Sequence, residues 1–488
     1  MPAMVMMERA GLAVYGALAK LLPEGGKVMV VCGKGHNGGD GFAVARLAMQ
    51  HGYQVECLVT SSERELRDGC RQQMLQCRAQ GLQPVFYDDG RFARRLEQLG
   101  KADLIIDAIL GTGTAGSITG GVQDAIHAIN RSGVPVLAID VPSGIHPDTG
   151  EEMDESIWAL RTVTLGLPKP YLFQGIGMEH AGYWSVEQIG YPCELLCAPT
   201  HARLMDEAWA GSLIPERLRA SHKGANGHML LVAGSDRYRG ATVLAAKAAY
   251  RAGAGMVTVA AVEKVCAAVA AQVPEAILLP LPEVDGLVSP AAADVILQNH
   301  TRFTASVFGP GLTHEAPVVE FLQRIWARWE LSAVVDADAL NAASMGVELP
   351  AAPCVLTPHP GELSRLLQVP IPMLQADRFA SVRQAVAMTG KTVLLKGPFS
   401  IIGAPDEPLN VNPTGNPGMA SAGMGDVLAG MIGTLMAQDV PPYEAASASV
   451  FWHGLAGDLC AQEMGGIGFV ARDVAQALPR ARAKLTAS

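Results

Sequence analysis

Short apolar runs alternate with helical patterns through the first part of the chain. The runs lie at residues 27–32, 53–59, 102–109 and 134–139, and glycine or polar residues bound each of them. Runs of this length are typical of strands buried on both faces of a parallel sheet. Because helical segments separate them, the pattern predicts a parallel α/β sheet.

The second part of the chain repeats this organisation with different residues. Apolar runs again end in polar turns, at residues 228–233, 256–260, 307–312, 334–336, 355–357 and 392–396. We find no sequence repeat that relates the two parts, which indicates two unrelated α/β domains in one chain. The periodicity fades between residues 191 and 214, where prolines are frequent, so we predict a first domain at residues 1–210 and a second at 215–488.

Composition narrows the class of protein. The chain has 488 residues, 49% hydrophobic and 17% charged, with a net charge of −10. This charge argues against a nucleic acid as the main partner, although loops on an acidic protein still bind phosphate. The nine cysteines are odd in number and scattered, which suggests reduced thiols in the cytoplasm. No apolar run approaches the length of a membrane span, so we expect no membrane partner.

A glycine-rich stretch at residues 412–426 precedes an apolar helical segment at 427–436. The glycines predict a loop, and the following helix offers N–H groups and a dipole that favour a phosphate. Asp426 then lies beside the anion, where it could accept a proton from a hydroxyl that attacks phosphorus. The alternative is an N-cap aspartate after a glycine turn, and the local sequence leaves both open.

A second glycine-rich loop, residues 33–41, follows the first predicted strand and precedes a helix at 42–50. Its glycines satisfy the G-x-G-x-x-G pattern and Glu56 lies about twenty residues on, so a nicotinamide-dependent dehydrogenase is one alternative. However, Asn37 and Asp40 add polar side chains where that pattern needs only backbone. The loop therefore indicates a site that recognises more than a pyrophosphate.

Oxygen-bearing side chains gather at the predicted carboxyl ends of these strands. Asp107 and Asp140 each end a strand, and Ser143 follows closely. Ligands of open α/β sheets bind at this edge. The oxygens of Asn37, Asp107 and Ser143 predict a site for a hard cation, although any single aspartate here could be a turn or cap residue.

The second domain has its own candidates. His359 lies between two prolines in a stiff loop, which favours contact with a ligand over a place in the core. Lys396 follows an apolar strand and precedes glycine, which favours a phosphate or nucleotide contact. Asp336 and Asp338 suit either Mg²⁺ binding through water or structural turns, and the sequence does not decide between them.

Three motifs of the first domain, GKGHNGGDG at 33–41, LIIDAILGTG at 104–113 and IDVPSG at 139–144, resemble those of the NAD(P)H-hydrate epimerase family. The resemblance covers about residues 5–210 and implies a Rossmann-like fold. It implies a potassium ion held by Asn37, Asp107 and Ser143, and a catalytic role for Asp140. The implied substrate contacts are His36, Asn37, Gly38, Gly39, Asp40, Gly111, Thr112, Gly113, Thr114, Ala115, Gly116, Ser117 and Asp140. His36 departs from the asparagine usual in the family, which alters one of these contacts.

The motifs SHKG, GAGMVT, GPGL, DADALN, TPHPGE, LKG and NPGMASAGMGDVL, spread over residues 221–428, resemble the nucleotide-dependent NAD(P)H-hydrate dehydratases. The resemblance covers nearly all of residues 215–488 and implies a ribokinase-like fold. The implied contacts with the hydrated dinucleotide are Ala254, Gly311, His359 and Asp426. Those with the adenine nucleotide are Lys396, Gly397, Pro398, Phe399, Ser400 and Gly425. The run Pro398–Ser400 is bulkier than the family's usual one, which affects the shape of the adenosine pocket.

Together the resemblances imply a bifunctional enzyme that repairs NADHX and NADPHX, the hydrated forms of NADH and NADPH. One domain would interconvert the R and S hydrates with K⁺ bound. The other would dehydrate the S form with Mg²⁺ and ADP, releasing AMP and phosphate. We expect a homo-oligomer. The alternative is a ribokinase-like small-molecule kinase whose N-terminal half only binds a nucleotide.

Overall fold

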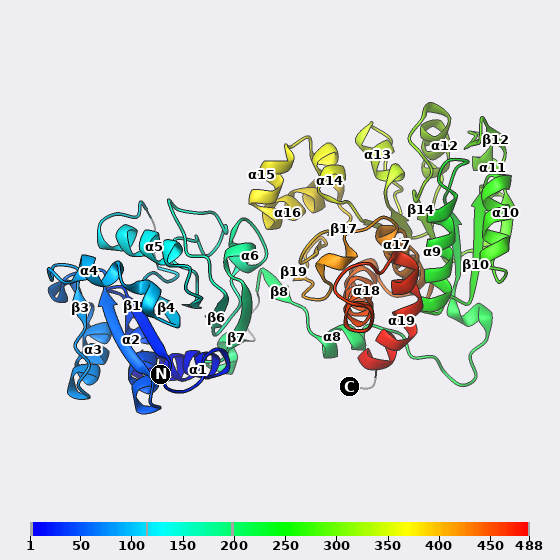
Figure 1. Cartoon of the computed structure of the whole chain (residues 1–488). Coiled ribbons are helices and arrows are strands. Elements are labelled where there is room, and N and C mark those ends of the chain that lie inside the picture. Colours follow the sequence, from blue (N-terminus) through cyan, green and yellow to red (C-terminus); the bar gives the residue numbers. More distant parts are fainter. Residues whose placement is uncertain (1–2, 114–115, 197–199, 487–488) are drawn as a thin grey trace. The chain divides into compact units, whose positions relative to one another are not determined.

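The computed structural model describes residues 3–113, 116–196 and 200–486 (Figure 1). The chain divides into two compact units, residues 1–199 and 200–488. Each unit has its own sheet and its own core, so we describe them separately. In the described residues, no helix is both long and apolar enough to cross a membrane.

The first unit is a parallel sheet with helices on both faces. In the described residues the sheet has seven strands in the order β3-β2-β1-β4-β5-β6-β7, all parallel. The strands are β1 (Lys27–Cys32), β2 (Gln54–Val59), β3 (Val85–Phe86), β4 (Leu104–Ala108), β5 (Val136–Ile139), β6 (Arg161–Leu165) and β7 (Tyr183–Glu187). The strand order reverses between β1 and β4, and in open α/β sheets ligands bind at such a reversal.

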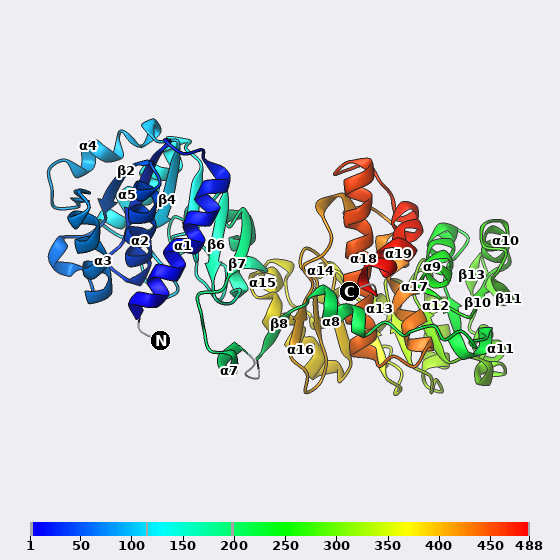
Figure 2. The same ribbon diagram turned by 90° about the horizontal axis from the view of Figure 1, so that it is seen from below.

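Two separate clusters of buried side chains cover the two faces of this sheet. One cluster joins α1 (Ala3–Leu21), α2 (His36–Gln50) and α3 (Asp68–Ala79) to the sheet, and the other joins α4 (Phe92–Leu96) and α5 (Gly121–Ser132). Figure 2 shows α1, α2 and α3 lying side by side. The smaller helices of the unit are α6 (Gly177–His180) and α7 (Cys193–Leu196). The two covered faces explain why the strands are apolar throughout rather than alternating.

The second unit has a ten-stranded sheet among the described residues, in the order β11-β10-β9-β14-β15-β16-β17-β18-β19-β8. The strands are β8 (Ala202–Leu204), β9 (His228–Val232), β10 (Met256–Ala261), β11 (Ile277–Pro280), β14 (Ala305–Phe308), β15 (Ala333–Val335), β16 (Cys354–Leu356), β17 (Thr392–Leu395), β18 (Ile401–Gly403) and β19 (Leu409–Val411). The strands from β11 to β17 are parallel, whereas β18 is antiparallel to both of its neighbours. A separate hairpin joins β12 (Glu283–Val284) to β13 (Leu287–Val288).

Among the helices of the second unit, one begins at the carboxyl edge of the sheet. They are α8 (Glu207–Ser212), α9 (Arg239–Ala252), α10 (Glu263–Gln272), α11 (Ala292–Leu297), α12 (Ala316–Trp326), α13 (Asp338–Ser344), α14 (Pro360–Leu367), α15 (Ile371–Ala376), α16 (Arg378–Thr389), α17 (Met424–Ala437), α18 (Pro442–Met464) and α19 (Ala471–Leu485). Almost every side chain of α17 is buried, and α17 packs on α9 and α18 and against β9, β14 and β15.

The segment just before residue 215 belongs to the second unit. Strand β8 pairs in parallel with β19, and α8 packs on α18 and α19. The units therefore divide after residue 199, whereas the sequence placed the end of the first domain at 210. The difference has a physical reason, because β8 covers hydrogen-bonding groups that β19 would otherwise expose at the edge of the sheet.

Both helices that follow glycine-rich stretches begin earlier than the sequence predicted. Helix α2 begins at His36 rather than 42, and α17 begins at Met424 rather than after Asp426. In α2 the glycines serve close packing and not a left-handed turn. A Cβ atom on Gly38 would lie 1.9 Å from the carbonyl oxygen of Gly33, and one on Gly41 would lie 2.4 Å from Cβ of Ala108.

Candidate active sites

Three side chains predicted as cation ligands meet at the carboxyl edge of the first sheet. Asp107 lies in β4, between Val31 of β1 and Ala138 of β5. Its Oδ1 accepts a hydrogen bond from Ser143 Oγ at 2.6 Å and its Oδ2 accepts one from Ser143 N at 2.8 Å. Asn37 Nδ2 donates to Leu110 O at 2.7 Å, and Leu110 N in turn donates to Ser143 Oγ at 2.9 Å, so the three side chains are linked through Leu110.

Asp107 is fully buried, and no lysine, arginine or histidine of the described residues pairs with it. Burial raises the pKa of Asp107 to about 6, although the hydrogen bonds from Ser143 and Ile109 favour the charged form. An ionised carboxylate in such a place is costly unless a cation accompanies it. The oxygens of Asn37, Asp107 and Ser143 are hard ligands, so the residues present fit a bound alkali cation.

Asp140 comes directly after β5 and is held by several donors. Its Oδ1 accepts hydrogen bonds from Leu165 N at 2.9 Å and from Thr164 Oγ1 at 3.3 Å, and it forms an ion pair with Lys169. The sequence did not single out Lys169, which lies 29 residues further along the chain in no recognised motif. Only the pairing of β5 with β6 brings the two residues together.

The remaining predicted residues of the first site lie in two segments. Residues 36–40 are the first five residues of α2, with His36 exposed and Asn37, Gly38 and Gly39 buried. In the second segment Gly111 lies against Asn37, since a Cβ atom there would be 3.3 Å from that of Asn37. Thr112, Gly113, Gly116 and Ser117 are exposed around this edge. Thr114 and Ala115 lie outside the described residues.

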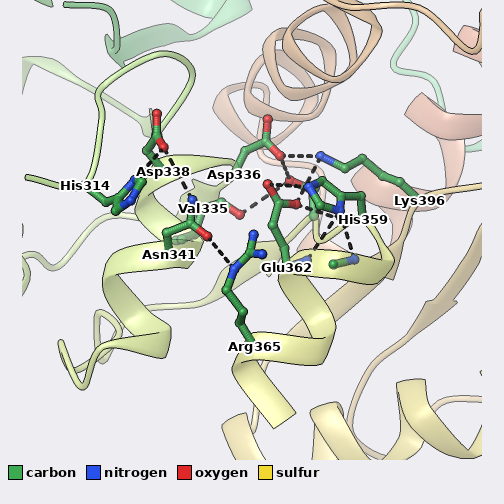
Figure 3. A network of polar contacts seen from close by, with 11 residues as sticks. His314, Val335, Asp336, Asp338, Asn341, His359, Glu362, Arg365 and Lys396 are labelled. Atoms are coloured by element: carbon green, nitrogen blue, oxygen red, sulfur yellow. Dashed lines mark hydrogen bonds and ion pairs between the residues drawn. The ribbon is translucent and has the colours of Figure 1, made fainter. Parts of the chain in front are cut away.

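The second site is a network of charged side chains at the carboxyl ends of β15, β16 and β17 (Figure 3). Asp336 is buried, accepts a hydrogen bond from Thr357 Oγ1 at 2.7 Å and pairs with Lys396 Nζ at 2.7 Å. Glu362 lies 3.8 Å from the same ammonium group. Burial lowers the pKa of Lys396, but Asp336 and Glu362 outweigh it and the net pKa is raised. Lys396 is therefore a permanent cation of this site.

The two aspartates that the sequence could not assign have different places. Asp336 faces Lys396, whereas Asp338 begins α13 and accepts hydrogen bonds from Thr313 N at 2.8 Å and from Asn341 at 3.4 Å. Asp338 thus fixes the loop after β14. Glu362 belongs to the TPHPGE motif, but it was not among the predicted site residues.

His359 is the N-cap of α14 and keeps half of its side chain exposed. Its Nδ1 accepts hydrogen bonds from Gly361 N at 3.0 Å and Glu362 N at 3.3 Å, while Glu362 Oε2 accepts from His359 N at 2.8 Å. Burial, Lys396 and Arg365 lower the pKa of His359. The imidazole is therefore neutral and can donate from Nε2.

Asp426 is in the first turn of α17, after an N-cap glycine, Gly423, with φ of +92°. Burial and the charge of Asp336 raise the pKa of Asp426 to about 7, although Lys396 acts in the opposite direction. A Cβ atom on Gly425 would lie 3.4 Å from Lys396 Nζ, so this glycine lets the helix start approach the ammonium group. Asp426 thus shares an electrostatic environment with the network of Figure 3.

The predicted nucleotide loop, Gly397–Ser400, connects β17 to β18 and starts directly after Lys396. Buried Arg378 donates to Pro398 O at 2.7 Å and to Phe399 O at 3.3 Å. Phe399 adopts φ of +47°, a conformation uncommon for a bulky residue. Arg378 was not predicted as a site residue, because an arginine at the start of a helix is usually exposed to solvent.

Gly311 lies at the same edge as Asp426, but Ala254 does not. Gly311 follows β14 with φ of +66°. Ala254 precedes β10, and its neighbour Gly253 accepts a hydrogen bond from Gln438, just after the far end of α17, at 2.9 Å. A helix of 14 residues is about 20 Å long, so the structure separates Ala254 from Asp426 by about that distance. The substrate contact implied for Ala254 stays a prediction.

Comparison with protein families matches both units. Residues 3–171 match the model described as YjeF-related protein N-terminus, and residues 229–480 match the model described as NAD(P)H-hydrate dehydratase. The bifunctional NAD(P)H-hydrate repair enzyme Nnr of Moorella thermoacetica is 36% identical over 98% of this chain and 92% of its own length. The chain belongs to the bifunctional NAD(P)H-hydrate repair enzymes. The counterpart from Escherichia coli is 32% identical over 97% of this chain and 88% of its own.

Solved structures match the second unit of the repair enzyme. A ribokinase-like superfamily protein of Enterococcus faecalis has a TM-score of 0.52 at 28% identity, over 58% of this chain and 96% of its own. The ADP/ATP-dependent NAD(P)H-hydrate dehydratase of Bacillus subtilis, co-crystallised with ATP and Mg²⁺, has a TM-score of 0.51 at 29% identity, over 57% and 97%. The predicted fold class and the predicted pair of activities, epimerase and dehydratase, are confirmed.

Proposed function

We propose that the repair enzyme epimerises NADHX and NADPHX at the carboxyl edge of the first sheet. The buried carboxylate of Asp107 supports this placement most directly, because Asn37 and Ser143 complete an oxygen-lined site for K⁺ beside it. When bound, K⁺ would compensate the charge of Asp107. The start of α2, residues 111–113, residues 116–117 and Asp140 then surround the place of the hydrated ring.

Dehydration of the S hydrate takes place at the start of α17. The observation that carries this assignment is Asp426, a carboxylate with its pKa raised to about 7 at a helix N-terminus beside Lys396. A base with this pKa is half ionised near neutral pH, which suits proton transfer. Asp426 accepts the proton of the hydroxyl as that oxygen attacks the terminal phosphate of the nucleotide. Phosphate is then eliminated and the ring double bond is restored.

The chain's own groups stabilise the charge of this reaction. The N–H groups at the start of α17 and the ammonium group of Lys396 face the transferred phosphoryl group. His359 and Gly311 contact the hydrated dinucleotide, and residues 397–400 with Gly425 contact the adenine nucleotide. We propose ADP as the donor, giving AMP. Among the described residues no cluster of histidine, cysteine or carboxylate side chains is arranged to hold a metal, so Mg²⁺ would arrive with the nucleotide phosphates.

We also propose that the enzyme works in the cytoplasm. The described free cysteines are buried and unpaired with one another as disulfides, which suits a reducing cytoplasm. We propose a homo-oligomer, and sedimentation of the full chain tests this.

The experiment that tests the dehydratase site compares Asp426→Asn with the unchanged enzyme on a mixture of R and S hydrates, with ADP, Mg²⁺ and K⁺. We expect loss of NADH formation with R/S interconversion intact. Asp406→Asn, at an exposed turn of the same unit, is the matched control and should keep both activities. Dehydration by Asp426→Asn at an undiminished rate would rule out the assignment, and a stable phosphorylated product would favour a kinase instead.

A further inference from the structure

Lys169 makes three polar contacts, and all of them concern Asp140 or the residues that hold Asp140. Its ammonium group pairs with Asp140 Oδ1, donates to Leu165 O at 2.7 Å and lies 3.3 Å from Thr164 Oγ1. Both charged side chains are largely buried, with exposed fractions of 17% for Lys169 and 15% for Asp140. A lysine that only served solubility would extend into water.

Asp140 is oriented so that only one of its carboxylate oxygens is used by the protein. In the part of the chain that the structure describes, every hydrogen bond to this carboxylate goes to Oδ1. Its backbone is fixed as well, with φ of +67°, and Tyr171 donates to its carbonyl oxygen at 2.8 Å. Oδ2 therefore remains available to a ligand.

A second carboxyl group, that of Asp40, lies near the start of α2 and is close enough for the charge of Asp140 to act on it. Burial and the charge of Asp140 raise the pKa of Asp40 well above its ordinary value. No hydrogen bond or ion pair satisfies the side chain of Asp40 within the described residues. The structure thus brings the unpaired carboxyl group of Asp40, whose pKa is raised, near a carboxylate that is paired with a lysine. Titratable pairs whose environments differ in this way commonly divide the roles of acid and base.

We propose that Asp40 and Asp140 are the acid and the base of the epimerase reaction, and that Lys169 is the positioning residue that holds Asp140 ready for it. This inference rests on the epimerase site proposed above. Lys169 acts through Asp140, because its ammonium group is used up by Asp140, Thr164 and Leu165.

The proposed epimerisation needs no reactant other than the hydrate and the two carboxyl groups. In the hydrate, the ring carbon that carries the added hydroxyl is also bonded to the ring nitrogen. Asp140 takes the hydroxyl proton, the carbon–nitrogen bond breaks to leave an aldehyde, and Asp40 protonates the nitrogen. Rotation of the aldehyde exposes its other face, and the reverse proton transfers close the ring as the opposite epimer. Both carboxyl groups return to their starting states.

The test measures conversion of the pure R hydrate to the S hydrate by chromatography, using the full chain with K⁺. For Lys169→Met we expect kcat to fall about 100-fold, within the range of general acid–base catalysis, with KM little changed. Lys169→Arg should recover at least a tenth of the activity, because it restores the ion pair. Lys101→Met, at an exposed lysine of the same unit, is the matched control and should be fully active.

Three results separate this inference from the site on which it rests. Asn37→Ala tests the site itself, so full activity of that variant would remove the epimerase site. If Asn37→Ala is inactive but Lys169→Met is fully active, only the role of Lys169 is wrong. If Lys169→Met raises KM as much as it lowers kcat, and arginine recovers nothing, Lys169 only maintains the local fold and the inference is also wrong.

The acid is tested by a measurement that does not depend on turnover. We expect NMR titration to show a lower pKa for Asp40 in Asp140→Asn than in the unchanged enzyme, because the neighbouring charge is gone. Asp40→Asn should lose R/S conversion while keeping dehydration of the S hydrate. An unchanged Asp40 titration would show that the two carboxylates do not act as a pair.

Discussion

The two units of this enzyme solve the same electrostatic problem in opposite ways. Each has a buried aspartate at the carboxyl end of a central strand, Asp107 in the first and Asp336 in the second. Each aspartate accepts a short hydrogen bond from a hydroxyl on a neighbouring loop, from Ser143 at 2.6 Å and from Thr357 at 2.7 Å. The difference is the cation, because Lys396 lies 2.7 Å from Asp336 whereas Asp107 has only neutral donors among the described residues.

The two sites therefore differ in the source of their positive charge. In the dehydratase unit the compensating cation is covalently part of the chain, and Lys396 can also face a phosphoryl group. In the epimerase unit the buried carboxylate is left for a bound ion to compensate, so activity there should depend on the salt present.

Removing the ammonium group of Lys396 should cause the largest losses of stability and of activity. In Lys396→Met the buried Asp336 loses its partner, which we expect to destabilise the second unit by about 3–5 kcal/mol. Dehydration should fall about 10³-fold, the scale on which loss of an electrostatic donor slows a reaction. Measuring NADH formation from the S hydrate, together with thermal unfolding, checks both expectations.

Two further variants separate stability from catalysis at this position. Adding Asp336→Asn to Lys396→Met should recover part of the lost stability but none of the rate, because no buried charge is then left unpaired. Lys264→Met, at an exposed lysine that forms a surface ion pair with Asp236, should change stability by at most about 1 kcal/mol. An unimpaired dehydratase in Lys396→Met would show that this cation is not needed.

The sequence predicted the framework of both sites because strands and their ends are encoded locally. The apolar runs at 27–32 and 392–396 became β1 and β17, and the polar residues after such runs gathered at one edge, as parallel strands require. Asn37, Asp107 and Ser143 came together as expected, although 36 residues separate the last two.

What the sequence missed depends on tertiary contacts. Lys169 and Arg378 carry no local motif, and only the pairing of strands and the path of the 397–400 loop reveal their partners. The early starts of α2 and α17 were missed because glycine is read as a helix breaker, whereas here it allows close packing.

The epimerase unit should respond to its external cation. We expect Asp107→Asn to reduce R/S conversion about 100-fold, since the ligand charge for K⁺ is lost. K⁺ should raise the melting temperature of the unchanged enzyme and not that of Asp107→Asn, because only a specific site couples the ion to folding. Calorimetry measures the melting temperatures of both proteins in K⁺ and in tetramethylammonium, an ion too large for such a site.

Asp124→Asn, at an exposed aspartate in the first turn of α5, is the control and should keep both the activity and the response to K⁺. Equal melting temperatures in the two salts for the unchanged enzyme would mean that Asp107 is not compensated by an ion. The dehydratase unit, which carries Lys396, should show no matching response.

The smallest effect concerns pH and the position of Asp426 between Asp336 and Lys396. With its pKa raised to about 7, the base is mostly protonated at pH 6 and mostly ionised at pH 8, so kcat/KM for dehydration should rise about tenfold across that interval. Because the charge of Asp336 raises the pKa of Asp426, Asp336→Asn should move the midpoint to lower pH in whatever activity it retains. A midpoint near pH 4 in the unchanged enzyme would show that the environment of Asp426 does not tune the base, and that Lys396 dominates the local charge instead.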